Sequence, residues 1–176
     1  MSSSLFEVLG DVEVVVRHSL HRELAIWHRD KGLPGEWYEN AHGMLTSRAM
    51  DELARAKGRL TSRNIPSSPS SLIPELPFGF WRFLLTRTYA STIWRIVGRK
   101  AFPHVAPNEA GLLWATMGRL HRLRNLIAHH EPIFWRLLES DHSDSMWVLH
   151  AVSPEVHIWA KNRSSFNDVF RMRPIR

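Results

Sequence analysis

Apolar residues recur along this chain at intervals of three and four, the spacing of one face of an α-helix, in several separate stretches. The first covers about Leu5–His28, preceded by Ser4 as a candidate N-cap with Glu7 three residues on, a pattern typical of a capping box. A second helix is expected at about Ser47–Leu60, which is rich in good helix formers. No segment alternates apolar and polar residues over a useful length, so we predict an all-α protein.

The second half of the chain continues the helical pattern between clear breaks. Phe80, Trp81, Leu84 and Leu85 have the spacing of a buried stripe on a helix that starts near Pro77, and the pattern persists as far as Gly98. Short helices are expected from Ser153, with Pro154 in the first turn, and after Ser165. Residues 62–74 are rich in Ser and Pro without apolar periodicity, which predicts a loop: a surface connection or a flexible flap.

Composition limits the architecture and the compartment. A chain of 176 residues that is 44% hydrophobic can bury one core, so we expect a single domain over 1–176. The absence of Cys excludes disulfides and thiolate metal sites and is compatible with a reducing cytosol. The opening residues do not resemble a signal peptide, and no apolar run approaches the length of a membrane span, so a cytoplasmic protein without membrane contact is expected. The net charge of +6 favours an anionic partner, although a generic basic surface is the alternative.

The stretch Gly111–Leu138 contains the most informative residues. Its first part predicts a helix that ends near His130, on which Leu113, Met117, Leu120 and Ile127 share one face. Arg124 lies near the middle of that apolar face, so its guanidinium must be paired or must point into a wet cleft or an interface. Asn125 and His129, four residues apart, are expected side by side at the edge of the face.

An arginine, an amide and an imidazole in this arrangement can cut RNA without a metal ion. An imidazole exchanges protons near neutral pH, and a guanidinium can bind the oxygens of a phosphate. The spacing alone is weak evidence, because an Arg followed by a His also occurs at Arg22/His28 and Arg124/His130. The structural alternative is that Arg124 bridges two helices and His129 only stabilises a helix C-terminus.

Four segments of the chain resemble one family in the same order. The segment from Leu123 to Phe134, Leu-Arg-Asn-Leu-Ile-Ala-His-His-Glu-Pro-Ile-Phe, looks like the signature of Abi-like proteins, the abortive-infection branch of the HEPN superfamily. Leu5–Glu13 resembles the early helix of that family, Glu75–Trp81 its central signature, and Ile93-Trp94 with Ala101-Phe102-Pro103 the connection that follows. Family members often carry a further N-terminal segment, and they commonly have Arg-Asn where this chain has Arg17-His18.

The resemblance implies a HEPN-type helical bundle with additional short helices, and an endoribonuclease that forms a 2′,3′-cyclic phosphate in phage defence or a toxin–antitoxin context. It maps the catalytic residues onto Arg124, Asn125 and His129. It also implies a homodimer with a composite cleft, in which we expect Met117 and Leu120 near the interface, and an antitoxin or phage-derived trigger. We expect neighbouring residues to contact the RNA substrate: His121, Arg122, His130 and Glu131.

A non-catalytic HEPN-type module that binds RNA, a nucleotide or a protein is the main alternative. Histidines group at His18/His21 and at His121/His129/His130, but without the spacing of a zinc site, so no metal and no cofactor is expected. A DNA-reading helix around Arg119 and Arg122 is disfavoured by the Leu-rich face of the same segment.

Overall fold

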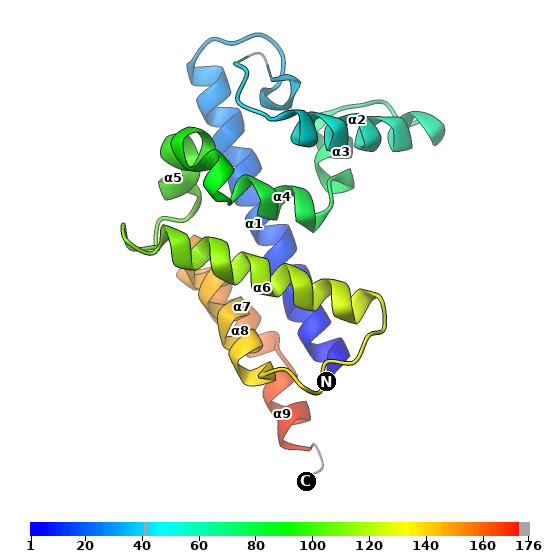
Figure 1. The fold of residues 1–176 in the computed structure, drawn as a ribbon, viewed down its shortest axis with the longest axis vertical. Helices are drawn as coiled ribbons and strands as arrows, with labels where there is room; N and C mark the ends of the chain where they lie inside the picture. Colours follow the sequence, from blue (N-terminus) through cyan, green and yellow to red (C-terminus); the bar gives the residue numbers. More distant parts are fainter. Residues whose placement is uncertain (41, 173–176) are drawn as a thin grey trace. The chain divides into compact units, whose positions relative to one another are not determined.

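The computed structural model describes residues 1–40 and 42–172, and within these residues it contains helices and turns but no strand. The all-α prediction is confirmed (Figure 1). The α-helices are α1 (Ser2–Asp30), α2 (Ser47–Ser62), α3 (Pro69–Glu75), α4 (Phe78–Leu84), α5 (Arg99–Ala101), α6 (Ala110–Ala128), α7 (Leu138–Val152), α8 (Pro154–Arg163) and α9 (Phe166–Arg171). Two short 3₁₀ turns, η1 (Trp37–Glu39) and η2 (Arg87–Tyr89), and a π-helix, η3 (Ala90–Gly98), complete the described elements.

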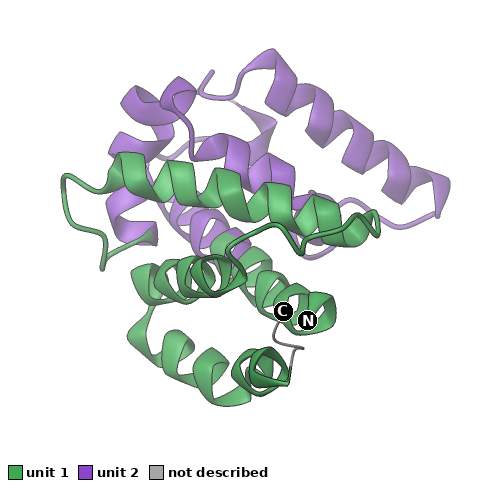
Figure 2. Cartoon of the chain, turned by 60° about the horizontal axis from the view of Figure 1, so that its bottom comes forward, with its two compact units in different colours: residues 1–16, 102–176 green, residues 17–101 purple. Residues whose placement is uncertain are grey.

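The chain divides into two compact units (Figure 2). Unit 1 contains residues 1–16 and 102–176, and unit 2 contains residues 17–101, so α1 contributes its first half to one unit and its second half to the other. In unit 1, α7 packs beside both α6 and α8. In unit 2, α2 packs beside α3. The prediction of one domain over 1–176 stays a prediction.

The buried residues of each unit follow from helical periodicity. In unit 1 the fully buried side chains include Leu5, Leu9, Leu113, Met117, Leu120 and Phe166. In unit 2 they include Trp37, Leu53, Leu60, Phe78, Trp81 and Tyr89. The predicted stripe Phe80, Trp81, Leu84 and Leu85 is buried, which confirms its assignment to the core.

Two local predictions were wrong. Helix α1 begins at Ser2, so Ser4 lies inside the helix and its hydroxyl donates to the carbonyl of Met1 (2.8 Å) instead of capping. The expected loop 62–74 is shorter, because α3 begins at Pro69. There the Ser68 side chain accepts from the backbone N–H of Ser71 (3.3 Å), while the Ser71 hydroxyl accepts from the N–H of Ser68 (2.9 Å), a reciprocal cap made by two serines.

The prediction for α8 was confirmed in detail. Ser153 is its N-cap and accepts from the N–H of Val156 (3.2 Å), and Pro154 occupies the first turn. Helix α9 also begins after Ser165, as expected. Helix α6 covers most of the predicted motif helix and ends two residues earlier than expected.

Candidate site at the C-terminal end of α6

Helix α6 forms because it combines good helix formers with a continuous apolar face. Leu113, Thr116, Met117, Leu120 and Leu123 are buried on that face. Met117 and Leu120, which were expected at or near a dimer interface, belong to this face and cannot themselves form the contact, and the interface stays a prediction. Both side chains are fully buried within the protomer, which leaves no surface for a partner to contact.

The helix ends in a Schellman motif made by two histidines. The N–H of Glu131 donates to the carbonyl of Leu126 (2.8 Å) and the N–H of His130 to that of Ile127 (3.1 Å), the two reversed bonds that define the motif. His129 is the C-cap, and His130 adopts the left-handed conformation (φ 57°) that is usually taken by Gly. The turn exposes both imidazoles, and it directs the chain away from the helix axis.

Arg124 is the cation that the sequence predicted on the apolar face. Its side chain is 35% exposed, and its Nε lies 3.8 Å from Oε2 of Glu13 on α1. This separation is a charge contact and too long for a hydrogen bond, so the guanidinium keeps donors available. Pairing and partial exposure together explain how a charge is tolerated on this face.

The polar flank of α6 contains His121, Asn125 and His129, spaced four residues apart. The amide nitrogen of Asn125 lies 3.5 Å from Nε2 of His121, one turn back along the helix. The backbone carbonyl of Asn125 accepts from the His129 N–H (2.9 Å). Arg122 is exposed on the same side of the helix. The Asn125 side chain thus contacts His121, and a contact between the side chains of Asn125 and His129 stays a prediction.

The three predicted catalytic side chains do not meet within one protomer. Among residues 1–40 and 42–172, no hydrogen bond or ion pair joins the side chains of Arg124, Asn125 and His129. Five residues at about 100° each turn the helix by roughly 140° between Arg124 and His129, so the two side chains leave α6 on different sides.

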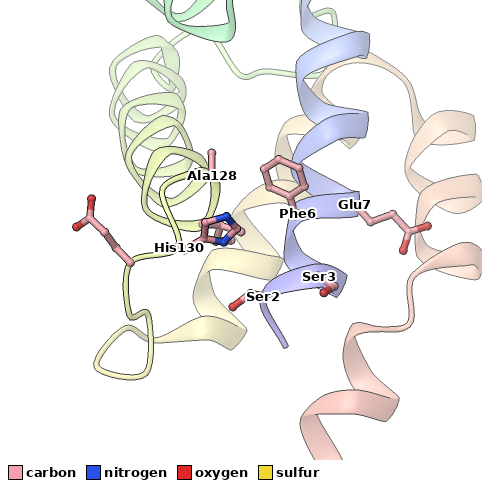
Figure 3. Close-up of a pocket in the computed structure, with 8 residues that line it drawn as sticks. Ser2, Ser3, Phe6, Glu7, Ala128 and His130 are labelled. Carbon is pink, nitrogen blue, oxygen red and sulfur yellow. The ribbon is translucent and has the colours of Figure 1, made fainter.

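A cavity of about 700 Å³ opens in unit 1, between the first turns of α1 and the end of α6 (Figure 3). Figure 3 shows the rings of His130 and Phe6 pointing into this space, while the side chain of Glu7 points away from it. The Glu7 carboxylate instead pairs with Arg163 on α8 (3.2 Å). The lining residues are Ser2, Ser3, Phe6, Glu7, Ile127, Ala128, His130 and Glu131.

The cavity lies on the Arg124 side of α6. Ile127 and Ala128 follow Arg124 by three and four residues, so they belong to the same face of the helix. Of the two adjacent histidines, His130 lines the cavity and His129 does not. Of the predicted substrate-contacting residues, His130 and Glu131 line it, whereas His121 and Arg122 belong to the polar flank.

An exposed apolar loop follows the motif at 132–137. Phe134 is 79% exposed, Trp135 62% and Leu137 81%. The loop is held in place by the buried Ile133 and by Arg136, whose Nε donates to Asp141 on α7 (2.9 Å). Exposed large apolar side chains on a tethered loop are typical of a contact surface.

Sequence reasoning missed the residues that α1 contributes to this region. Ser2, Ser3 and Phe6 carry no motif, and only the packing of α1 beside α6 makes them part of a cavity. Glu13 carried a usable signal, because on a helical wheel it lies on the apolar face of α1 between Leu20 and Leu24, much as Arg124 lies on the apolar face of α6. Opposite charges on the apolar faces of two helices predict an ion pair between them.

The described residues contain no group of three or more His, Cys, Asp or Glu arranged to hold a metal ion. Within the same part of the chain, no helix is long and apolar enough to cross a membrane. Comparison with known proteins identifies no relative: no family model, curated protein or solved structure matches this chain.

Proposed function

We propose that this chain is a metal-independent endoribonuclease. The observation that carries the proposal is a partly exposed Arg124 on the last turns of α6, followed by two exposed imidazoles and an adjacent cavity. In this reaction the 2′-OH of the RNA attacks the adjacent phosphorus and loses its proton. The bond to the 5′-oxygen breaks, that oxygen gains a proton, and the products are a 2′,3′-cyclic phosphate and a 5′-OH.

His129 is the group proposed to move these protons, because a neutral imidazole can accept one and an imidazolium can donate one near neutral pH. Arg124 opposes the negative charge that builds on the non-bridging oxygens. Asn125 binds the phosphate through its amide. His130 and Glu131 contact the nucleotide from the cavity wall, and His121 and Arg122 contact the RNA on the polar flank.

The resemblance of four ordered segments to Abi-like proteins supports the same proposal. A HEPN-type bundle, a role in phage defence or a toxin–antitoxin pair, a phage-derived trigger or antitoxin as partner, and a cytoplasmic location are part of it. The all-α architecture is compatible with that fold type.

A homodimer is also part of the proposal. Because Arg124 and His129 leave α6 on different sides without contact, one phosphate is more easily held by Arg124 of one protomer and His129 of a second copy. The exposed side chains of Phe134, Trp135 and Leu137 directly follow the motif and offer apolar surface for that contact.

The alternative is a non-catalytic binding module, and one observation favours it. Arg124 already contacts Glu13 and Asn125 already contacts His121, so both side chains have structural partners without any substrate. Incubating purified protein with RNA in EDTA separates the two functions. Cleavage by the wild type that the folded His129→Ala variant lacks is expected, and intact RNA with the wild type would contradict the nuclease proposal.

A further inference from the structure

The positive charge of this protein is concentrated in one unit. Unit 2 contains 14 Lys and Arg against 7 Asp and Glu, a formal charge of +7. Unit 1 contains 9 Lys and Arg against 10 Asp and Glu, a formal charge of −1, although it carries the candidate site. A polyanion is therefore attracted to unit 2, and the candidate site itself supplies little of that attraction.

Among the described residues, four of the 14 cations of unit 2 are held in ion pairs, one of them Arg22 with Glu23. On α2, Arg55 pairs with Glu52 (2.6 Å), while Arg59 and Arg63 both pair with Glu75. These ion pairs lower the pKa of Glu75, with the hydrogen bond from Arg63 as the largest cause. A guanidinium held by a carboxylate has less charge to offer to a phosphate.

The cations at the end of η3 belong to the larger group without an ion pair, and they lie close together in one short segment. Arg95, Arg99 and Lys100 are all exposed, and in the described part of the chain no carboxylate lies within ion-pair distance of any of them. Arg99 and Lys100 follow Arg95 by four and five residues. Because a π-helix pairs residue i with residue i+5, its turn is wider than that of an α-helix, and residues four and five apart return to nearly the same side. We call these three residues the basic stripe.

The backbone beneath the basic stripe is fixed by packing on its opposite side. Ile93, Val97 and Ala101 are buried, and Trp94 folds so closely over Gly98 that an added Cβ there would collide with the indole ring. π-helical turns such as η3 are uncommon and occur frequently at functional sites. Three cations held on a packed helix lose less freedom on binding a phosphate chain than three cations on a loop would.

Unit 2 lacks the apolar anchors that a membrane-binding surface uses. Such surfaces combine cations with exposed large apolar side chains that enter the lipid. Among the described residues of unit 2, Ile65 is the only large apolar residue that is largely exposed, and Trp94 and Ile96 of η3 are only partly exposed. Charge without an apolar face favours a nucleic-acid backbone over a lipid bilayer.

We propose that the basic stripe, Arg95, Arg99 and Lys100, binds the phosphate backbone of RNA outside the cleavage site. The choice of RNA as the ligand rests on the proposed function, whereas the preference for a phosphate chain rests on the charges. The stripe adds affinity that unit 1, with its charge of −1, does not supply.

Binding to a single-stranded RNA that carries 2′-O-methyl groups tests the stripe, because this RNA lacks the nucleophile and cannot be cleaved. The full-length R95A/R99A/K100A variant should bind it at least tenfold more weakly at low salt. The slope of log Kd against log salt should fall by about 2, the value for three contacts at about 0.7 each. The R95Q/R99Q/K100Q variant, which keeps the longer side chains, should lose binding equally.

The matched control is R55A/R59A/R63A, which removes the same charge from paired positions of the same unit and should bind within about threefold of the wild type. If both triple variants bind the RNA equally weakly and circular dichroism shows unchanged helix content, the proposal is overturned, because the overall charge of unit 2 would then determine binding. Binding of the wild type to phosphatidylserine vesicles but not to the RNA would overturn it in favour of a membrane. If the wild type binds the RNA through the basic stripe but does not cleave unmodified RNA, the nuclease proposal is contradicted and the proposed binding surface is supported.

Discussion

Nε of Arg124 lies 3.8 Å from Oε2 of Glu13, and this contact joins the motif helix to the first helix of the chain. Both side chains are partly exposed, so the pair is worth roughly 0.2–1 kcal/mol. A phosphate that binds Arg124 competes with Glu13 for the same guanidinium.

Replacing Glu13 with Gln should therefore strengthen binding of RNA. KM should fall by about two- to five-fold while kcat changes little. The reason is that the carboxylate opposes binding of the substrate and of the transition state to the same extent. Steady-state cleavage assays measure both constants. A large fall in kcat would contradict this and would mean that Glu13 positions Arg124 for catalysis.

The predicted catalytic residues can be tested against near neighbours on the same helix. Arg124→Ala and His129→Ala should each reduce RNA cleavage by about 10² or more, because they remove charge stabilisation and proton transfer respectively. Arg122→Ala, which removes an exposed guanidinium from the same helix, should reduce kcat much less. Equal losses in Arg122→Ala and Arg124→Ala would point to non-specific binding of RNA. EDTA should leave the wild-type rate unchanged.

His130 allows stability and activity to be separated. Because it occupies a left-handed position, His130→Gly should stabilise the fold by about 0.5–1 kcal/mol in chemical denaturation. The same change removes the ring from the cavity, so cleavage should fall. A variant that is more stable and fully active would exclude His130 from substrate binding, and a loss exceeding that of His129→Ala would make His130 the proton carrier.

The stability of the protein should depend on pH through His21. The indole N–H of Trp37 donates to Nδ1 of His21 (3.0 Å), so the bond requires an unprotonated Nδ1. Burial first, and His18 second, lower the pKa of His21 below 6.5. The contribution of this hydrogen bond to the stability of the fold is therefore fully present above about pH 6.5 and is lost as the pH falls through the lowered pKa.

Thermal unfolding at pH 7.5 and pH 5 measures this effect. His21→Gln, whose carbonyl can accept from Trp37 without titrating, should flatten part of the pH dependence. Burial also lowers the pKa of His142, whose ring stacks on that of Phe166 with 4.3 Å between the ring centroids. The part of the pH dependence that comes from His142 should therefore remain in this variant. His21→Ala should cost about 1–3 kcal/mol at pH 7.5, because it leaves the Trp37 N–H without an acceptor. An unchanged pH profile in both variants would contradict the assignment.

Two aspartate substitutions separate folding from association. Leu120→Asp puts a charge in a fully buried position and should unfold the protein, with a loss of about 4 kcal/mol or more. Leu137→Asp changes an exposed residue of the loop 132–137 and should leave the fold intact while weakening self-association. Sedimentation and circular dichroism on the same samples measure both. A dimer that survives Leu137→Asp, Phe134→Asp and Trp135→Asp would exclude this loop as the interface.

The helices that the sequence predicted well are those whose signals are local. Helix α8 has a Ser N-cap and a Pro in its first turn, and α6 repeats its apolar residues over five turns, so both could be located without tertiary information. The π-helix η3 could not, because apolar residues at intervals of three and four do not distinguish its wider turns from those of an α-helix. The cap of α3 was missed because a serine at its third position replaced the usual Glu or Gln.

The candidate site shows the same division. Arg124 could be singled out because a charge on an apolar face is costly, and the structure does supply a partner for it. Which of the two histidines faces the cavity depends on a single left-handed residue at the end of α6, and helical periodicity does not describe residues beyond the helix. The contribution of α1 to the cavity arises from packing between distant segments.

The uneven distribution of charge has a kinetic consequence. An unequal field orients the chain while it diffuses towards a polyanion, so encounters in which unit 2 leads are more frequent than chance. Such steering raises the association rate and weakens as salt screens the field, whereas the lifetime of the complex depends on short-range contacts. Capture and retention of an RNA strand would then be controlled by different parts of this chain.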